Sequence, residues 1–390
     1  MLKRLIKPSK SHSFFLFGAR GTGKTSLVKE HFLQEDTLYI DLLRDSEFEV
    51  LNIEPDSLEE RLLAKPGIKR VVIDEVQKIP ALLDVVHRLI ENHKNVQFIL
   101  TGSSARKLKR GGANLLAGRA WVYHLYPLSY AELGEKFSLP SALEWGGLPG
   151  QLELKSDDDK KEFFRAYTST YLKEEILQEQ LVRDLKPFQR FLPIAAQNSG
   201  AVINFSKIGR DVGVAPQTAE SYFQILEDTL LGFRLPAFHR SIRKQERMNP
   251  KFYLFDTGVL RTLLKTIGTP LQSGTYAFGR AFEHFLVREI ITLSSYARRD
   301  DEFYYYATHG GREVDLVIDR GPEGLIFIEI KSTDRVSDDD LRHLHALSEE
   351  KKLKDASFYC FSLDKNAAKK GDVLCLYWEE GLKELGLSKV

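Results

Sequence analysis

Short apolar runs alternate with helical patterns over roughly the first third of the chain. The runs lie at Ser13–Phe17, Leu38–Asp41, Arg70–Asp74, Gln97–Thr101 and Trp121–Leu125. Strands that alternate with helices predict a parallel sheet with helices on its faces, because each parallel strand needs a crossover connection. The pattern therefore predicts an α/β domain in this part of the chain.

Two changes in composition divide the rest of the chain. The glycine and proline cluster Gly146–Gly150 leads into the charged stretch Lys155–Lys161, and a second glycine-bearing stretch spans Gly268–Gly274. Such stretches are typical of boundaries, and the 390 residues exceed one ordinary core. We predict three domains, at residues 1–150, 151–270 and 271–390. The second is expected to be mainly helical, and the third to contain a helix followed by three strand-like runs.

The composition narrows the classes of function. Lys and Arg number 56 and Asp and Glu 55, so binding to nucleic acid would require a local basic patch. No apolar signal region and no run of about eighteen apolar residues occurs, so we expect a cytoplasmic protein without a membrane segment. Cys360 and Cys375 lie in apolar runs and are expected to be buried and reduced.

The segment from Gly18 to Thr25 fits the nucleotide-binding pattern G-x-x-x-x-G-K-[ST]. A strand-like run precedes it and a helical pattern follows it, which is the context this pattern requires. Its glycines let backbone N–H groups turn toward phosphates, Lys24 brings a positive charge, and the Thr25 hydroxyl reaches Mg²⁺. We therefore predict binding of ATP or GTP. The predicted nucleotide-binding residues are Gly18, Ala19, Arg20, Gly21, Thr22, Gly23, Lys24, Thr25 and Ser26.

Polar residues also follow two later apolar runs. Asp74 and Glu75 end one of them, and we predict that Asp74 helps to hold Mg²⁺ while Glu75 acts as the general base for the attacking water. The next run ends in Thr101-Gly102-Ser103-Ser104. Because open α/β sheets bind ligands at the carboxyl ends of their strands, Thr101 or Ser103 is the predicted sensor of the terminal phosphate. The alternative for these hydroxyls is a simple turn.

These motifs resemble those of prokaryotic AAA-superfamily ATPases that carry a C-terminal domain of unknown function. Further shared segments are Val76–Pro80, Leu116–Arg119 and Tyr126–Ser129. The resemblance favours ATP and implies an ATP-dependent conformational machine. It also implies that Arg119 stabilises charge near the γ-phosphate, within one chain or across the interface of a homo-oligomer. A salt-bridged surface arginine is the alternative for Arg119, and Arg106 and Arg20 are weaker candidates for the same role.

Residues Phe205–Leu226 have the pattern of a helix-turn-helix, and two strand-like runs, Phe233–Phe238 and Phe252–Phe255, follow as a wing. The second helix offers Gln, Glu and Ser side chains, which are poorly suited to a phosphate backbone. The segment between the wing strands is basic and is the candidate contact with DNA, although a solvated charged loop is the alternative. Its basic residues are Arg240, Arg243, Lys244, Arg247 and Lys251.

The third domain carries a second candidate site. Glu283 lies in a helical pattern, Asp315 in the run Glu313–Ile318, and Glu329 and Lys331 on one face of the run Phe327–Lys331. Carboxylates that bind Mg²⁺ beside a lysine are what metal-dependent phosphodiester cleavage requires. The order resembles the PD-(D/E)XK superfamily of restriction-endonuclease-like folds, with Val314 in place of the motif's proline.

That resemblance implies metal ligands at Glu283, Asp315 and Glu329, and catalytic roles for Asp315, Glu329 and Lys331. The alternative is a scaffold whose carboxylates pair with Lys331 and Arg312. The predicted fold is thus a P-loop NTPase sheet, a helical winged-helix region and a restriction-endonuclease-like α/β domain. Three functions remain open: ATP hydrolysis that rearranges these modules on DNA, an ATP-dependent protein-interaction switch with an inactive nuclease fold, and an ATP-regulated, metal-dependent endonuclease.

Overall fold

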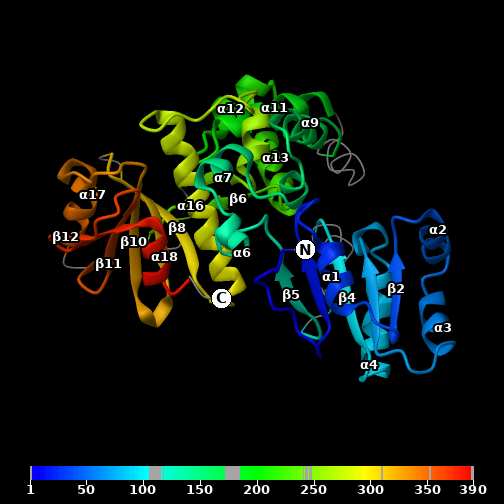
Figure 1. Ribbon diagram of the computed structural model, residues 1–390. Coiled ribbons are helices and arrows are strands. Elements are labelled where there is room, and N and C mark those ends of the chain that lie inside the picture. Colours follow the sequence, from blue (N-terminus) through cyan, green and yellow to red (C-terminus); the bar gives the residue numbers. More distant parts are fainter. Residues whose placement is uncertain are drawn as a thin grey trace.

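The computed structural model describes residues 2–104, 116, 118–171, 185–239, 241, 245, 248–308, 311–350 and 353–387. Three groups of elements follow one another along the chain (Figure 1). An α/β part comes first, a mainly helical part follows, and a second α/β part ends the chain. The long helix α16 (Tyr276–Tyr296) lies between the middle helices and the last sheet.

The first part contains a five-stranded sheet in which every neighbouring pair is parallel. In spatial order its strands are β2 (Thr37–Asp41), β3 (Arg70–Asp74), β4 (Gln97–Gly102), β1 (Phe14–Phe17) and β5 (Trp121–His124). The α/β prediction for this part is confirmed. The five apolar runs form the five strands, within one residue at each end.

Helices cover both faces of this sheet. Successive side chains of β1 point to opposite faces, and each face packs against its own apolar core. Phe15 and Phe17 pack with the core that includes α4, whereas Phe14 and Leu16 pack with α1 and with Tyr296 of α16. The helical elements are α1 (Lys24–Phe32), α2 (Asp45–Ile53), α3 (Ser57–Leu63), the 3₁₀ turn η1 (Val76–Lys78) and α4 (Leu82–Asn92). Two short elements follow β5: α6 (Tyr130–Leu133) and η2 (Gly134–Lys136).

The middle part is mainly helical, and its elements pack around one core of aliphatic and aromatic residues. Helix α9 (Asp157–Ala166) continues as a π-helical turn, η3 (Tyr167–Tyr171), and residues 172–184 lie outside the described ranges. The remaining helices are α7 (Leu139–Trp145), α8 (Pro149–Leu152), α11 (Leu185–Gln197), α12 (Phe205–Val212), α13 (Pro216–Asp228) and α15 (Thr257–Leu263).

The predicted helix, turn, helix and hairpin occur in that order. Gly213, with a φ of 81°, ends α12 in the left-handed conformation, and Pro216 opens α13. The strands β6 (Gly232–Leu235) and β7 (Lys251–Leu254) then pair antiparallel. The first strand is shorter than the expected Phe233–Phe238, and the second begins one residue before the expected Phe252.

The last part has a mixed six-stranded sheet rather than three strands. Its spatial order is β12 (Ala368–Lys370), β13 (Val373–Tyr377), β11 (Ser357–Ser362), β10 (Leu325–Lys331), β9 (Glu313–Asp319) and β8 (Glu302–Ala307). The cores place α16 (Tyr276–Tyr296) and α18 (Trp378–Glu384) on one face and α17 (Asp338–Ser348) on the other. The 3₁₀ turn η4 (Gly321–Glu323) joins β9 to β10. The first of these cores also takes in residues of α7 and of the β6–β7 hairpin, so the middle and last parts share apolar contacts.

Candidate functional site

The phosphate loop follows β1 at the carboxyl edge of the first sheet. Gly21 and Gly23 have φ angles of 81° and 96°, a left-handed conformation that disfavours other residues. Gly23 is also the N-cap of α1, so no side chain there competes for the free N–H groups of the first helical turn. Lys24 is 5% exposed, and its ammonium donates to the carbonyl oxygen of Gly18 at 2.8 Å. Backbone donors and one lysine therefore surround this turn, and Ser26 lies exposed in the same helical turn.

Asp74, at the end of β3, accepts hydrogen bonds from three hydroxyl groups. Thr25 donates at 2.8 Å, Tyr39 of β2 donates at 2.9 Å, and Thr101 of β4 also donates. Asp74 is 2% exposed. Burial and the neighbouring Asp74 raise the pKa of Tyr39, so its hydroxyl stays protonated and donates. Three strands and the first turn of α1 thus bring three hydroxyls and one carboxylate to the same point.

Glu75 occupies a left-handed backbone conformation, with φ 62° and ψ 46°. Strain of this kind costs on the order of 1–3 kcal/mol and persists where surrounding contacts fix it. Here the backbone N–H of Glu75 donates to the Thr101 hydroxyl at 3.2 Å, and the Gln77 amide donates to the Glu75 carboxylate. The same amide donates to Ser103 at 3.0 Å. Gln77 thereby connects the predicted base to one of the two predicted phosphate sensors.

This group of residues fits a magnesium nucleotide. The Lys24 ammonium is held by carbonyl oxygens of its own loop, which phosphate oxygens are able to replace. The carboxylate of Asp74 and the hydroxyl of Thr25 are the oxygen donors that Mg²⁺ prefers. Tyr39 and Gln77 were not predicted from the sequence. A tyrosine on an apolar strand and a glutamine two residues after Glu75 carry no motif, and only the fold brings them to this edge.

Arg119 does not lie at this site. It forms a salt bridge with Glu91 in the last turn of α4, and this contact lowers the pKa of Glu91. Two residues later, Trp121 pairs with Phe14, the first residue of β1. Arg119 is therefore at the amino edge of the sheet, whereas the phosphate loop is at the carboxyl edge. A role for Arg119 within the same chain is wrong for this reason, and a role in a neighbouring subunit stays a prediction. Arg106 lies outside the described residues.

Other parts of the chain contact the outer surface of the phosphate loop. Arg4 donates to the carbonyl oxygen of Thr22 at 2.7 Å and to the hydroxyl of Tyr296, in α16, at 3.0 Å. It also forms a salt bridge of 2.9 Å with Glu132 of α6, whose side chain is fully buried. From the π-helical turn of the middle part, the Tyr167 hydroxyl donates to the carbonyl oxygen of Arg20 at 2.9 Å. The middle part of the chain thus has a direct hydrogen bond to the loop, and the last part is connected to the loop through Arg4.

The second predicted site is a cluster of carboxylates beside a cavity of about 610 Å³. Glu283 (α16), Asp315 (β9) and Lys331 (β10) line this cavity. The Lys331 ammonium lies 2.7 Å from the carboxylate of Glu329, and the Asp315 carboxylate accepts from the backbone N–H of Ile330 at 2.8 Å. Burial and the nearby Asp315 raise the pKa of Glu329 to about 8 and also raise the pKa of Glu283. The fold therefore brings the four predicted residues into one region.

Lys251 was predicted to belong to the basic DNA-binding segment, and this prediction is wrong. Its side chain is 2% exposed in β7, and its ammonium lies 2.5 Å from Glu313 and 3.8 Å from Glu283. Burial lowers the pKa of Lys251, but the surrounding carboxylates raise it above its ordinary value. The neighbouring Tyr253 donates to Glu283 at 2.7 Å. Strand β7 packs against the last part of the chain and turns these two side chains into the carboxylate cluster. Arg240, Arg243, Lys244 and Arg247 lie outside the described residues.

The predicted metal ligands of the last part are not preformed for binding. Among the residues that the structure describes, no three His, Cys, Asp or Glu side chains are grouped so as to hold a metal ion. Glu329 is turned to Lys331, and Glu283 is turned to Tyr253 and Lys251. Protein donors thus already neutralise two of the three expected ligands.

Comparison with known families divides the chain into three matches. The AAA domain family matches residues 10–134, a domain of unknown function (DUF8612) matches residues 136–269, and another (DUF4143) matches residues 278–379. Together with the phosphate loop and the sheet, the first match supports a P-loop AAA ATPase domain. The domain boundaries at 150 and 270 stay predictions. Within the described part of the chain, no helix combines the length and apolar character needed to cross a membrane.

Relatives along most of the chain are themselves uncharacterized. A protein of Mycobacterium tuberculosis is 26% identical over 321 residues, which are 82% of this chain and 70% of the relative. A protein of Methanocaldococcus jannaschii is 23% identical over 62% of this chain and 60% of its own length. Among solved structures, domain III of the replication initiation protein DnaA from Thermotoga maritima has a TM-score of 0.27, at 17% identity, over 44% of this chain and 84% of that chain. A TM-score this low supports no functional conclusion.

Proposed function

We propose that this protein binds ATP with Mg²⁺ and hydrolyses it, and that the nucleotide cycle changes how the middle and last parts contact the first. The convergence of Lys24, Thr25, Asp74 and Glu75 at one edge of the sheet carries this proposal. These residues come from two separate segments, and each has the chemical type that its role requires.

In the proposed reaction, backbone N–H groups of the loop and of the first turn of α1 bind the phosphates. Lys24 exchanges its bonds to loop carbonyls for bonds to phosphate oxygens. Thr25 and Asp74 hold Mg²⁺, which supplies charge stabilisation at the phosphates when bound. Glu75 orients the attacking water and takes its proton, while Gln77 and Thr101 keep Glu75 in position. The water oxygen bonds to the γ-phosphorus, and the oxygen bridging to the β-phosphate leaves with ADP.

Coupling to the rest of the chain is proposed to run through Arg4 and Tyr167. Each bonds to a backbone carbonyl of the phosphate loop, at Thr22 and Arg20 respectively. A loop that reorganises around phosphates changes the geometry of these carbonyls. The change would bias the position of α16 through Tyr296 and of the middle helices through Tyr167.

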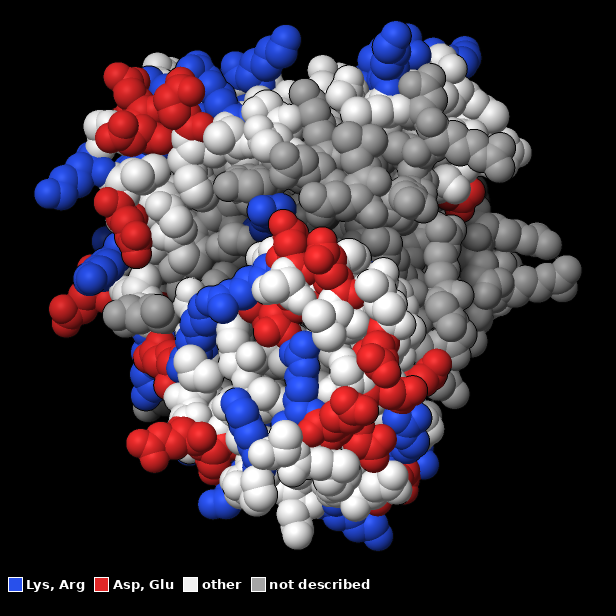
Figure 2. Space-filling model, turned by 90° about the vertical axis from the view of Figure 1, so that its right-hand side faces the viewer, with Lys and Arg blue, Asp and Glu red and all other residues white. Residues whose placement is uncertain are grey.

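We propose DNA as the polymer on which this rearrangement acts, and we assign the helix pair α12–α13 with the hairpin β6–β7 to a winged helix. The order of the elements and the basic segment between the hairpin strands support the assignment. Among the described residues on the face in Figure 2, Lys and Arg side chains alternate with Asp and Glu side chains. Ion pairs such as Arg61–Glu47 and Arg88–Glu59 account for part of this alternation.

A second candidate is an ATP-dependent protein-interaction switch with an inactive nuclease-like fold. The neutralisation of Glu283 and Glu313 by Lys251 favours this candidate over an endonuclease. Steady-state ATP hydrolysis with Mg²⁺, measured alone and with single-stranded or duplex DNA, separates the candidates. Stimulation whose salt dependence indicates phosphate contacts supports action on DNA. Hydrolysis that is indifferent to intact DNA supports the protein switch, and metal-dependent cutting that Asp315→Ala abolishes supports the endonuclease.

A further inference from the structure

A cleft of about 430 Å³ lies where the first part of the chain meets the end of α16. Strand β5 is at the edge of the first sheet on the side of α16, and it pairs with β1 (Figure 1). At its other edge, Arg298, which follows α16, donates to the carbonyl oxygen of Val122 at 2.8 Å. The N-terminal segment, residues 2–13, and the turn after α18 complete the walls. The charged and aromatic lining residues are Lys7, Tyr123, Tyr296, Arg298 and Arg299.

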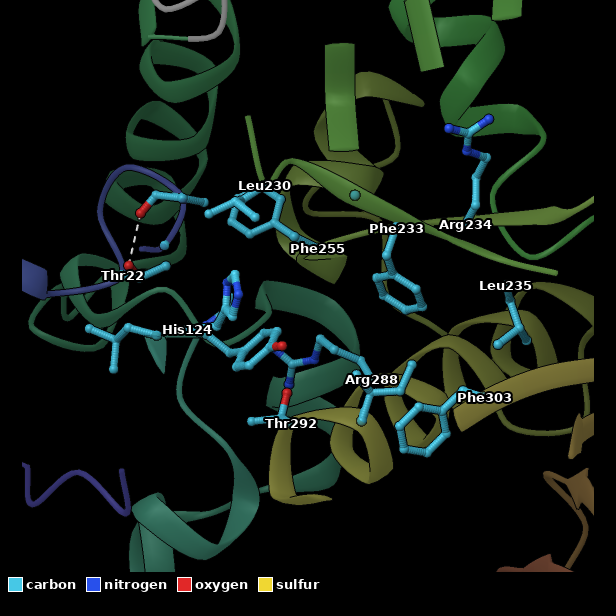
Figure 3. A pocket seen from close by; sticks show the side chains of 17 residues that line it. Thr22, His124, Leu230, Phe233, Arg234, Leu235, Phe255, Arg288, Thr292 and Phe303 are labelled. Atoms are coloured by element: carbon cyan, nitrogen blue, oxygen red, sulfur yellow. Dashed lines mark hydrogen bonds between the residues drawn. The ribbon is translucent and has the colours of Figure 1, made fainter. Parts of the chain in front are cut away.

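This cleft is separate from the cavity drawn in Figure 3. Successive side chains of a strand point to opposite faces. Tyr123 accordingly lines the cleft, whereas His124 lines the cavity of Figure 3 together with Thr22 of the phosphate loop. Among the described residues, the lining of the cleft takes in neither the phosphate loop nor Asp74 and Glu75. A ligand in the cleft would therefore be separate from the nucleotide.

The cleft is positively charged, and its cations reach the solvent. Lys7 and Arg298 are exposed, and Arg299 is partly exposed. None of the described residues that line the cleft is an Asp or a Glu. Of the acids that follow in the chain, Asp301 pairs with Arg320 at 3.3 Å. The cleft therefore has an excess of accessible positive charge, which favours an anionic ligand.

Contacts with backbone and aromatic groups hold the two arginines in place. The Arg298 guanidinium lies 4.6 Å from the ring centre of Tyr123 and donates through Nη1 to Val122. Arg299 donates to two carbonyl oxygens after α18, at 2.7 and 3.0 Å. Within the described part of the chain, Nε and Nη2 of Arg298 and the ammonium of Lys7 have no hydrogen-bond partner. Positioned cations with free donors suit a phosphate group, whose oxygens accept several hydrogen bonds.

The positive surface continues from the cleft along β5 to an exposed aromatic pair. The N-terminal segment follows β5, because the backbone N–H of Ser9 donates to the Tyr123 hydroxyl at 3.2 Å and His12 stacks on Trp121 with ring centres 4.5 Å apart. Lys10, between these two contacts, is exposed, and the segment contains no Asp or Glu. Trp121 is 43% exposed. We call this surface the β5 strip; its cationic and exposed aromatic residues are Lys7, Lys10, His12, Trp121, Arg298 and Arg299.

We propose that the β5 strip binds single-stranded DNA, with a backbone phosphate in the cleft and a base stacked on the His12–Trp121 pair. A single strand presents both phosphates and unpaired base faces, and proteins bind it with a cationic groove beside aromatic side chains. A duplex offers the phosphates but keeps its base faces stacked inside. The proposal rests on the proposed action on DNA for the identity of the polymer, and it adds a contact surface outside the winged helix.

The strip is connected to the nucleotide site through one hydrogen-bonded chain. Tyr296 lines the cleft, and its hydroxyl accepts from Arg4 at 3.0 Å. Arg4 in turn donates to the carbonyl oxygen of Thr22 in the phosphate loop at 2.7 Å. A strand bound in the cleft is therefore placed to influence the phosphate loop, and ATP to influence the strand.

The fluorescence of Trp121 tests base stacking in the full chain. The chain has three tryptophans, and the other two, Trp145 and Trp378, are buried. We expect a short oligothymidylate to quench Trp121, and an abasic strand of the same length to bind without quenching. Trp121→Leu should lose the quenching and bind at least fivefold more weakly. Binding of oligothymidylate by the wild type without quenching overturns the proposal, as does quenching that persists in Trp121→Leu.

Fluorescence anisotropy of the labelled strand over a range of salt concentrations tests the cations. Each phosphate contact of a single strand contributes about 0.7 to the slope of log K against log salt, so Lys7→Gln/Lys10→Gln should reduce the slope by about 1.4. The control Lys65→Gln/Lys155→Gln removes two exposed lysines elsewhere and should leave the slope unchanged. Equal slopes for the two double variants overturn the phosphate contacts.

The arginines of the cleft need a separate variant, because they also hold neighbouring backbone. Arg298→Gln/Arg299→Gln should weaken binding of the strand at least fivefold if it folds, and unchanged affinity in the folded variant contradicts a phosphate in the cleft. The exposed lysine pair makes no such contacts and decides the test if the arginine variant does not fold.

The outcome for the strip is distinct from the outcome for the proposed function. DNA binding that leaves Trp121 unquenched and keeps its salt slope in Lys7→Gln/Lys10→Gln overturns the strip but not the proposed action on DNA. Absence of binding to single-stranded and duplex DNA overturns both the strip and the choice of DNA as the polymer. Hydrolysis of ATP by the same protein is scored separately and would still stand.

Discussion

The hydroxyl of Thr25 donates a 2.8 Å hydrogen bond to the carboxylate of Asp74, although 49 positions separate the two residues in the chain. Strand β4 lies between β1 and β3 in the sheet, so the phosphate loop and Asp74 face each other across its carboxyl end. The hydroxyl of Thr25 and the carboxylate of Asp74 therefore lie close enough to bind the same divalent ion.

Glu75→Gln should separate binding of ATP from its hydrolysis. The substitution keeps the size of the side chain, and the phosphate loop does not depend on it. The amide cannot accept the proton of the attacking water, so we expect the hydrolysis rate to fall by about 10²–10⁴-fold. Affinity for ATP, measured with a fluorescent analogue, should stay within about threefold of wild type. Lys24→Ala is the matched control and should lose affinity. Weak ATP binding by Glu75→Gln would contradict the role of Glu75 as base.

Arg119→Ala should leave ATP hydrolysis unchanged at protein concentrations where the chain is monomeric. Arg119 pairs with Glu91 at the surface, far from the phosphate loop, and an exposed pair of this kind contributes little to stability. The measurement is the hydrolysis rate over a range of protein concentrations, with Glu91→Ala as a control for the ion pair. A loss of rate confined to high concentration in Arg119→Ala would show that the arginine acts in a neighbouring subunit.

The sequence predicted the first sheet and its nucleotide residues because those signals are local. Each strand is a short apolar run, and the residues at its carboxyl end are adjacent to it in the chain. Tyr39 and Gln77 were missed because they join the site only through strand order and one 3₁₀ turn. The prediction for Arg119 failed for a related reason. A motif gives the position of a residue along the chain, but it does not say at which edge of the sheet that residue lies.

Lys251 shows a different limit of sequence reasoning. Composition groups it with Arg240, Arg243, Lys244 and Arg247, and a basic run between two strands is usually solvated. In the fold, β7 enters the core shared by the middle and last parts, where Glu283 and Glu313 are its neighbours. The carboxylates that bury this lysine lie more than thirty positions later in the chain. Their pairing depends on packing between domains, which no local pattern records.

Glu289→Gln should remove part of the pH dependence of stability. The charged and titratable groups that face Glu289 are Arg288, Tyr130 and Glu132, and the backbone N–H of Tyr130 donates to it. Burial raises the pKa of Glu289 from an ordinary 4.5 to about 7, so the folded state binds a proton that the unfolded state has released. The contribution of Glu289 to the free energy of unfolding is therefore fully present below about pH 4.5 and is lost as the pH rises to about 7.

The expected size of this effect is about 3 kcal/mol, because one pKa unit corresponds to about 1.4 kcal/mol. Urea unfolding of wild type and Glu289→Gln at a series of pH values measures it. The free energy of unfolding of wild type, relative to the variant, should decline across this window and level off above it. A difference that does not change with pH would contradict the raised pKa.

Lys251→Met should convert the carboxylate cluster of the last part into a divalent-cation site. In the wild type the lysine ammonium neutralises Glu283 and Glu313, and we expect weak Mn²⁺ binding there. Removing one partner of a buried ion pair costs about 3–5 kcal/mol, because the remaining carboxylates are left without a counter-charge. The variant should therefore melt at a lower temperature, and Mn²⁺ should restore part of its stability in proportion to occupancy.

Asp315→Ala in the same background is the control, because it removes a predicted ligand and should abolish the rescue. Thermal unfolding with and without Mn²⁺ measures both effects. Tight Mn²⁺ binding by the wild type, lost in Asp315→Ala, would instead show that Lys251 yields to the metal and that the nuclease-like site is complete.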